Sequence, residues 1–179
     1  MSSNKKLIYT FFMLAMSHNA AAQTCQTDTI QATTPSSRFT VLGNGTVKDN
    51  KTGLEWKQCI EGLSGHSCTV GIAAEYTWQG ALQLAQATNT SGGFAGHSDW
   101  RVPKVGELWS ITELQCYKPS INANIFPNTP YSNDYWTSSL SALDSDCGRI
   151  MSFVYGKDNY VNESNCWNII EHAYVRLVR

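Results

Sequence analysis

The sequence predicts a single α+β domain with two helices, short antiparallel strands and long loops held by disulfides. Two stretches with helical spacing lie between turn-rich stretches that read as strands, an order unlike the repeated βαβ units of a parallel sheet. The six cysteines form an even number without a CxxC pair, which is typical of structural disulfides. Only 15% of the residues are charged, whereas six tryptophans and eight tyrosines can fill a core.

Residues 1–22 have the pattern of a signal peptide for bacterial export. The basic start MSSNKK precedes the apolar run LIYTFFMLAM, and three alanines before Gln23 offer a cleavage site. Ten apolar residues are too few to span a bilayer, which takes about 20, and no second long apolar run follows. We therefore expect no membrane span and a periplasmic, secreted or cell-surface location.

Cleavage after residue 22 leaves 157 residues, enough for one domain with a sizeable core. It removes Lys5 and Lys6, so the mature chain has 11 basic and 14 acidic residues and a net charge of −3. Nucleic-acid binding requires a basic surface, so this charge argues against a nucleic-acid partner.

The cysteines suggest three disulfides. Sequence proximity favours two pairs, and elimination gives the third: Cys59–Cys68, Cys147–Cys166 and Cys25–Cys116. Residues 23–37 are rich in threonine, serine and glutamine, a poor composition for a core. We expect them to form an N-terminal arm on the surface, fastened at Cys25, and residues 38–179 to form the domain.

Residues 38–59 read as paired strands with turns at Asn44-Gly45 and at residues 49–53. The alternation in LEWK predicts that Leu54 and Trp56 face inward and that Glu55 and Lys57 face outward. Further short strands are expected at YWTSS, GRIMSFVYG and AYVRLVR.

Two helices are expected between these strands. Thr77 can cap the first, whose apolar positions recur at helical spacing: Trp78, Ala81, Leu82 and Ala85. The second is predicted to start at Pro103, because proline suits the first turn of a helix. The stripe of this helix is formed by Val105, Leu108, Trp109 and Thr112.

The stretch GHSDWRVPKVGELWSI gathers charged residues that could form either an active site or a structural corner. In a catalytic interpretation, Asp99 would orient His97, and Arg101 would bind an anion. The chain offers no GxSxG, no HExxH and no free-cysteine motif that would supply a nucleophile or metal. The structural interpretation needs less, because Asp99 caps a turn, Arg101 pairs with a carboxylate and Trp100 fills the core. We favour the structural interpretation and expect no catalytic residues.

Several motifs in the same order resemble one family. SDWRVPKVGELWSI is similar to the DWRLP…EL signature of the C-terminal domain of the Legionella collagen-like protein, the Lcl C-terminal domain family. The resemblance extends over VKDNKTGLEWKQC, TWQGALQLA, GGFAGHSDWR, INANIFPNTP, YWTSS and YVRLVR, and covers residues 38–179. Val102 stands where leucine is usual. The signature itself falls on Asp99, Trp100, Arg101 and Pro103.

The resemblance implies a compact α+β domain similar to the C-type lectin and formylglycine-generating-enzyme folds. It also implies an exported or surface-displayed binding module, with some members adhering to sulfated polysaccharides. Such polymers require clustered basic residues, and residues 130–171 contain only Arg149 and Lys157 beside six acidic residues. The sequence therefore argues against a heparin-like ligand.

In lectin-like folds the recognition face is built from loops near the C-terminal strands. The corresponding loops here combine aromatic faces with amide groups, a mixture suited to sugars or protein epitopes. The predicted ligand-binding residues are Tyr155, Lys157, Asn159, Tyr160, Asn162, Asn165 and Trp167. The alternative is a pair of polar loops with no ligand.

We expect no cofactor, although calcium is an alternative. Oxygen ligands could come from Asp144, Asp146, Asp158 and Glu163, but the chain lacks an EF-hand loop pattern.

The sequence thus predicts an exported, non-catalytic binding or adhesion module that recognises a carbohydrate or protein ligand at the cell envelope. One alternative is a copper-dependent oxidase like the formylglycine-generating enzymes, which use a pair of free thiols. Another is a structural component of the envelope or of a pilus. The sequence does not predict the oligomeric state.

Overall fold

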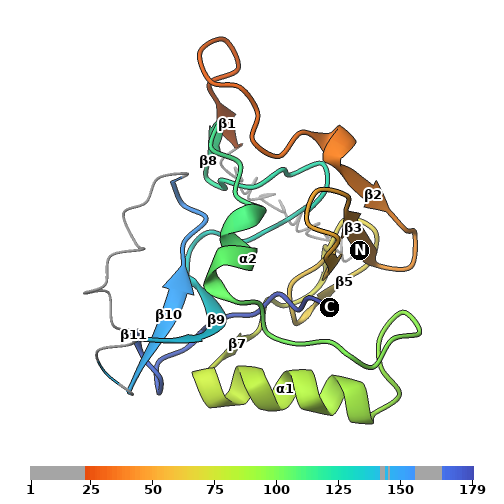
Figure 1. Cartoon of the computed structure of the whole chain (residues 1–179), viewed down its shortest axis with the longest axis vertical. Helices are drawn as coiled ribbons and strands as arrows, with labels where there is room; N and C mark the ends of the chain where they lie inside the picture. Colours follow the sequence, from red (N-terminus) through yellow and green to blue (C-terminus); the bar gives the residue numbers. More distant parts are fainter. Residues whose placement is uncertain (1–22, 142–143, 145, 156–166) are drawn as a thin grey trace, which may run out of the picture.

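The computed structural model describes residues 23–141, 144, 146–155 and 167–179. Within these residues the chain is an α+β domain with two α-helices, a short 3-10 helix and four small sheets, as predicted (Figure 1). The helices are η1 (Ser36–Arg38), α1 (Trp78–Thr90) and α2 (Val105–Ser110). The strands are β1 (Thr24–Cys25), β2 (Phe39–Val41), β3 (Thr46–Asp49), β4 (Glu55–Lys57), β5 (Leu63–Ser64), β6 (Val70–Gly71), β7 (Glu75–Tyr76), β8 (Cys116–Tyr117), β9 (Tyr135–Leu140), β10 (Cys147–Met151), β11 (Trp167–Asn168) and β12 (Ala173–Tyr174).

The largest sheet has five strands in the order β11-β10-β9-β12-β7. Its neighbouring strands are antiparallel except β12 and β9, which are parallel with Tyr174 opposite Tyr135. A second sheet has the order β2-β3-β4. Isolated bridges from Val178 to Trp56 and to Arg101 join the C-terminus to both β4 and the segment before α2. The chain end is therefore part of the core.

The burial of Glu55 corrects the alternation expected in LEWK. Glu55 was predicted to face outward, but it is buried, because the C-terminal segment covers that side of β4. The backbones of Glu55 and Arg179 exchange hydrogen bonds of 3.0 and 2.9 Å. Arg179 Nη1 also lies 2.5 Å from Glu55 Oε2, so the buried carboxylate has a charged partner.

Helix α1 follows its local sequence signals. The side chain of Thr77 accepts a hydrogen bond from the Gly80 N–H at 3.1 Å, so Thr77 is the predicted N-cap. Ala81 and Ala85 are buried on the face that packs against the five-stranded sheet. The ring N–H of Trp78 donates to the Thr137 carbonyl at 2.9 Å, which fixes the start of the helix to β9.

Helix α2 was predicted to begin at Pro103, but it begins at Val105. The reason is that Glu107 Oε2 accepts a hydrogen bond from the Lys104 N–H at 2.7 Å, so the cap lies at Lys104. Pro103 instead uses its carbonyl, which accepts from the Ser138 N–H of β9 at 2.7 Å.

Two of the predicted disulfides, Cys25–Cys116 and Cys59–Cys68, are present. Cys147 is also disulfide-bonded, and its predicted partner, Cys166, lies outside the described residues.

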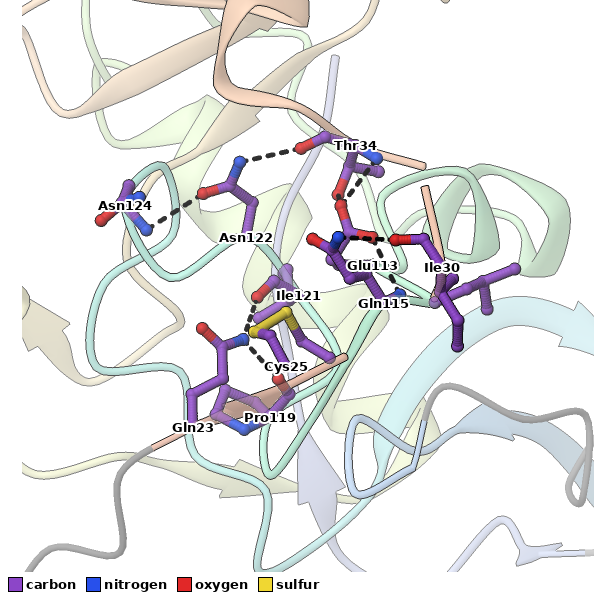
Figure 2. Close-up of a disulfide and its surroundings, with 12 residues drawn as sticks. Gln23, Cys25, Ile30, Thr34, Glu113, Gln115, Pro119, Ile121, Asn122 and Asn124 are labelled. Carbon is purple, nitrogen blue, oxygen red and sulfur yellow. Dashed lines mark hydrogen bonds between the residues drawn. A yellow bond between two sulfur atoms is a disulfide. The ribbon is translucent and has the colours of Figure 1, made fainter. Parts of the chain in front are cut away.

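The arm of residues 23–37 is bound tightly to the domain (Figure 2). Strand β1 pairs with β8, and the side-chain amide of Gln23 donates to carbonyls of Pro119 and Ile121. The Glu113 carboxylate accepts hydrogen bonds from the N–H groups of Thr33 and Thr34 at 2.9 and 2.8 Å. Thr34 is fully buried, so the arm contributes to the interior as well as the surface.

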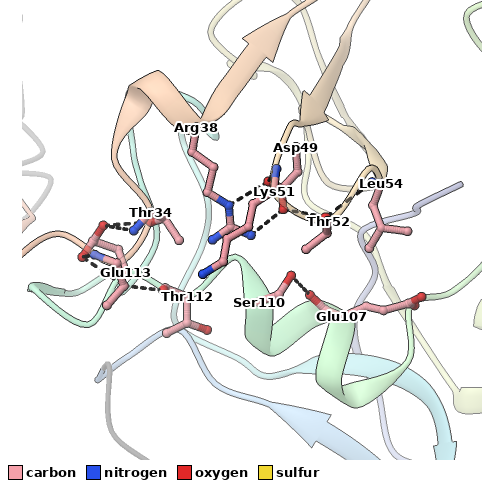
Figure 3. Close-up of polar contacts among 11 residues, drawn as sticks. Thr34, Arg38, Asp49, Lys51, Thr52, Leu54, Glu107, Ser110, Thr112 and Glu113 are labelled. Atoms are coloured by element: carbon pink, nitrogen blue, oxygen red, sulfur yellow. Dashed lines mark hydrogen bonds and ion pairs between the residues drawn. The ribbon is translucent and has the colours of Figure 1, made fainter.

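Charged groups also join η1 to β3. The Arg38 guanidinium contacts both carboxylate oxygens of Asp49, with Nε 2.7 Å from Oδ1 (Figure 3). Asp49 is fully buried and accepts further bonds from the Thr52 hydroxyl and the Lys51 N–H. Burial alone would raise the pKa of Asp49, but these bonds outweigh it and lower the pKa.

Candidate functional site

Two tyrosines and a lysine form a partly exposed platform beside the segment that follows β10. Tyr155, a predicted ligand-binding residue, is 50% exposed. Its ring stacks with that of Tyr117, with centroids 6.4 Å apart and planes 26° apart. The Lys118 ammonium lies 5.6 Å from the Tyr155 ring centroid. We call Tyr117, Lys118 and Tyr155 the aromatic platform.

The platform is built on rigid supports. Tyr117 ends β8, whose other residue, Cys116, is cross-linked to the arm. Tyr117 forms a backbone bridge with Tyr155, and the Lys118 N–H donates to the Val154 carbonyl at 2.8 Å. Figure 1 shows the chain beyond β10 rising beside β8.

A buried ring anchors the chain just before Tyr155. Phe153 is fully buried and packs edge-on against Tyr135, with ring centroids 4.8 Å apart. Its carbonyl accepts from the Ser120 N–H at 2.7 Å, which ties this segment to the one after β8. The two tyrosines are therefore held in place before any ligand arrives.

The platform offers chemistry suited to recognition rather than to bond making. Flat aromatic faces pack against apolar C–H surfaces, while hydroxyl groups at the ring edge form hydrogen bonds. The Lys118 ammonium can donate to ligand oxygens, and its contact with the Tyr155 ring keeps it near the surface. Sugars and protein loops both present such mixed surfaces.

Trp167 does not join this platform. It pairs with Gly148 at one end of β10, whereas Tyr155 follows the other end. Trp167 is partly buried and packs against the core cluster that contains Trp136. The structure therefore separates two residues that were predicted to share one face. The other predicted ligand residues lie outside the described residues: Lys157, Asn159, Tyr160, Asn162 and Asn165.

The candidate calcium ligands are only partly described. Asp144 and Asp146 are exposed in the turn before β10, and Asp144 Oδ1 accepts from the Asp146 N–H at 2.9 Å. Asp158 and Glu163 lie outside the described residues. Over the described part of the chain, no three histidine, cysteine or acidic side chains are grouped as metal ligands. Calcium binding stays a prediction.

The Asp-Trp-Arg-x-Pro segment forms a network of ion pairs. Both Nη atoms of Arg101 contact the Glu107 carboxylate, at 2.7 and 2.8 Å. The hydrogen bond from Arg101 is the main cause that lowers the pKa of Glu107. Asp99 Oδ1 accepts from Arg179 Nε at 2.8 Å, and this bond lowers the pKa of Asp99. Asp99 was predicted to cap a turn, but its carboxylate instead pairs with Arg179.

Trp100 is held in the core by its neighbours. The Asn89 side chain brackets it, accepting from the Trp100 N–H at 2.9 Å and donating to its carbonyl at 2.8 Å. The ring N–H donates to the Phe94 carbonyl at 3.0 Å. His97 contributes backbone hydrogen bonds to Phe94. Asp99 is bonded to Arg179 and not to His97, so the dyad of the catalytic interpretation is not assembled.

Sequence reasoning did not find two platform residues, Tyr117 and Lys118. They lie in CYKP, directly after Cys116, a stretch with no motif of its own. Their role depends on the pairing of β8 with a segment 38 positions away, at Tyr155. A local pattern does not encode such a pairing.

Comparisons with known proteins assign a family. A family model for the Lcl C-terminal domain matches residues 45–179, from the turn before β3 to the last residue. Searches among curated proteins and among solved structures found no significant match. The likeness to C-type lectins therefore stays a prediction. Among the described residues, no helix has the length and apolar character needed to cross a bilayer. On the extent of the family match, this chain belongs to the Lcl C-terminal domain family.

Proposed function

We propose that this chain is an exported, non-catalytic binding domain that recognises a carbohydrate chain or a protein partner at the cell envelope. The observation that carries the proposal is the aromatic platform, in which the half-exposed Tyr155 stacks on the partly buried Tyr117 beside Lys118. A half-exposed tyrosine held by backbone pairing loses little conformational freedom when a ligand binds. Surface aromatics of this kind recur in recognition sites.

The cysteines support export and argue against an oxidase that uses a thiol pair. Disulfides persist in oxidising compartments, and the two described pairs fit a periplasmic or extracellular protein. An oxidase that works through a thiol pair would need reduced cysteines, whereas every described cysteine is bonded. Maleimide labelling of the unfolded mature protein should therefore detect no free thiol. Two labelled thiols would favour the oxidase.

Binding is tested on a glycan array, with and without calcium, using the mature protein and the variant Tyr155→Ala. We expect the variant to lose about tenfold or more in affinity, because the Tyr155 ring no longer packs against the ligand. A tenfold loss corresponds to roughly 1.4 kcal/mol. The matched control is Ile170→Ala, since Ile170 is 70% exposed and lies outside the platform. It should bind as the unaltered protein does.

Melting temperatures make the result decisive. The exposure of Tyr155 implies that Tyr155→Ala keeps the melting temperature of the unaltered protein within a few degrees. Binding to glycans that survives in Tyr155→Ala and in Tyr117→Ala would contradict the platform as the site. A blank array, followed by capture of one protein partner that Tyr155→Ala fails to bind, would assign the platform to protein recognition.

A further inference from the structure

We infer that a groove of about 360 Å³ beside the Cys59–Cys68 loop is a second binding site, and that its ligand is a neutral sugar unit. The groove lies between the β2–β3 turn, the segment after β4 and Phe94. Its volume is at the lower end of the range of about 300–1,000 Å³ that small-molecule sites occupy. The lining residues that matter most are Asn44, Lys57, Ile60, Glu61, His66 and Phe94.

An ion pair beside an aromatic ring forms the polar part of the groove. Lys57 Nζ lies 2.8 Å from Glu61 Oε1, and the two side chains are each only 12% exposed. The same ammonium lies 4.4 Å from the centroid of the Phe94 ring. This geometry holds the lysine at a fixed point, unlike a lysine in solvent.

Hydrogen-bonding groups in the groove are left available for a ligand. Within the described residues, Glu61 Oε2, the Asn44 amide nitrogen and the His66 ring have no hydrogen-bond partner. The oxygen of the Asn44 amide accepts from the Thr46 hydroxyl at 2.7 Å, which fixes the orientation of the free amide N–H groups. The groove thus presents both donors and acceptors.

The ion pair selects against a charged ligand. An anion would compete with Glu61 for Lys57, and a cation would compete with Lys57 for Glu61. Either would leave one mostly buried charge without its partner, which is unfavourable. A hydroxyl group both donates and accepts, so it can bind Glu61 Oε2 and the Lys57 ammonium without separating them.

Apolar side chains supply the other half of a sugar site. Phe94, Ile60 and Leu63 line the same groove as the polar groups. A pyranose ring has C–H faces that pack on such surfaces and hydroxyl groups at its rim. Pockets with a mainly apolar lining and a few fixed polar groups are the usual sites for small ligands.

A buried arginine beneath the groove holds its floor in place. Arg176 is 1% exposed, and its Nη1 donates to the carbonyls of Lys57, at 3.0 Å, and Gln58. Its Nη2 donates to the Thr129 hydroxyl at 2.8 Å. The Gln58 N–H in turn donates to the Gly45 carbonyl at 2.9 Å, which joins the floor to the β2–β3 turn. The site is therefore formed before a ligand binds, which reduces the ordering cost.

The test is an NMR titration of the 15N-labelled mature protein with glucose, galactose, mannose and N-acetylglucosamine, each at millimolar concentration. We expect at least one sugar to shift the backbone amide signals of Gly45, Glu61 and His66 in a saturable manner. Glu61→Gln should weaken this binding at least tenfold, because it removes the carboxylate that pairs with Lys57 and accepts a hydrogen bond from a ligand hydroxyl. The control Glu171→Gln removes an exposed carboxylate outside the groove and should leave the dissociation constant unchanged.

Several outcomes would overturn the inference. One is that none of the four sugars shifts these amides. Another is that Glu61→Gln keeps the affinity while its spectrum shows a folded protein. Tighter binding of glucose 6-phosphate than of glucose at the same amides would refute the selection for a neutral ligand. The platform and the groove are formed by different residues, so Tyr155→Ala and Glu61→Gln report on the two sites separately.

Discussion

Arg176 is a buried cation whose described hydrogen bonds go to carbonyl and hydroxyl oxygens. Burial lowers its pKa to about 10, so it still carries its proton at neutral pH. Its guanidinium also lies over the Phe126 ring, 4.8 Å from the centroid. Buried arginines of this kind are retained where several backbone acceptors need donors at one point.

The first prediction concerns this arginine. Arg176→Met fills similar space but leaves the carbonyls of Lys57 and Gln58 without their donor, and each buried unsatisfied acceptor costs about 1–3 kcal/mol. Relief from burying a charge offsets part of this, so we expect a net loss of about 2–4 kcal/mol in urea unfolding. Arg149→Met, at a less buried position, should change stability by less than about 0.5 kcal/mol. Equal stability of the two variants would show that Arg176 is not a structural donor.

A second prediction concerns pH and the carboxylate that binds the arm. Burial would raise the pKa of Glu113, but hydrogen bonds from the N–H groups of Thr33, Gln115 and Thr34 lower it below its ordinary value of 4.5. The ionised form is therefore favoured by folding. Its contribution is fully present above about pH 4.5 and is lost as pH falls through the lower, folded-state pKa.

We expect Glu113→Gln to be less stable than the unaltered protein by about 1–3 kcal/mol at pH 7. The difference in stability should shrink as the pH falls below 4.5, because protonated Glu113 is neutral like the glutamine that replaces it. Urea unfolding at a series of pH values measures this. A difference that stays constant from pH 7 to pH 3 would show that the carboxylate charge does not hold the arm.

At the scale of elements, close packing between β10 and β9 depends on one glycine. A Cβ at Gly148 would lie 2.5 Å from the Trp136 ring and 3.1 Å from the Trp78 ring. The two rings belong to β9 and to the first turn of α1. The absence of a side chain at Gly148 therefore lets α1, β9 and β10 pack together at this point. Both indoles are also fixed by hydrogen bonds to backbone carbonyls, which leaves them little freedom to move aside.

We therefore predict that Gly148→Ala lowers stability by about 1–3 kcal/mol, as expected for an overpacked core. The matched control is Gly106→Ala in α2, where a Cβ would meet nothing within 4 Å. That substitution should raise stability by about 0.5–1 kcal/mol, because alanine favours the helix. Thermal unfolding of both variants tests this prediction. The change in stability must be negative for Gly148→Ala and positive for Gly106→Ala.

The elements that sequence patterns predict well are those built from local contacts. Thr77 and the apolar spacing that follows it are sufficient for α1, because cap, turn and stripe lie within nine residues. The start of α2 was misplaced because the Glu107 carboxylate, not the proline, defines the first turn. Glu55 was misjudged because its partner, Arg179, lies 124 positions away. The platform depends on a similar long-range pairing, so only Tyr155 of its three residues was found.

At the scale of the whole molecule, the arm and β2 extend the structural unit beyond the part that matches the family. The match begins at residue 45, yet Phe39 is a buried member of the main core cluster. Arg38 and Thr34, also before the match, bind the buried carboxylates of Asp49 and Glu113. Cys25 is cross-linked to Cys116 within the matched region. Residues 23–44 thus supply partners to both buried carboxylates and to Cys116.

The last prediction follows from this extension. A chain that begins at residue 45 loses the apolar contacts of Phe39 and frees the Cys116 thiol. It also removes the Arg38 guanidinium from Asp49 and the donors in Thr33 and Thr34 from Glu113. Each buried charge that loses its partner costs about 3–5 kcal/mol, and a typical domain has only about 5–15 kcal/mol in total. We expect the shortened chain to lack a cooperative urea transition by tryptophan fluorescence, whereas a chain that begins at residue 23 unfolds in one step. Cooperative unfolding of the shortened chain at a similar urea concentration would mean that the matched region folds alone and that the arm is only an attachment.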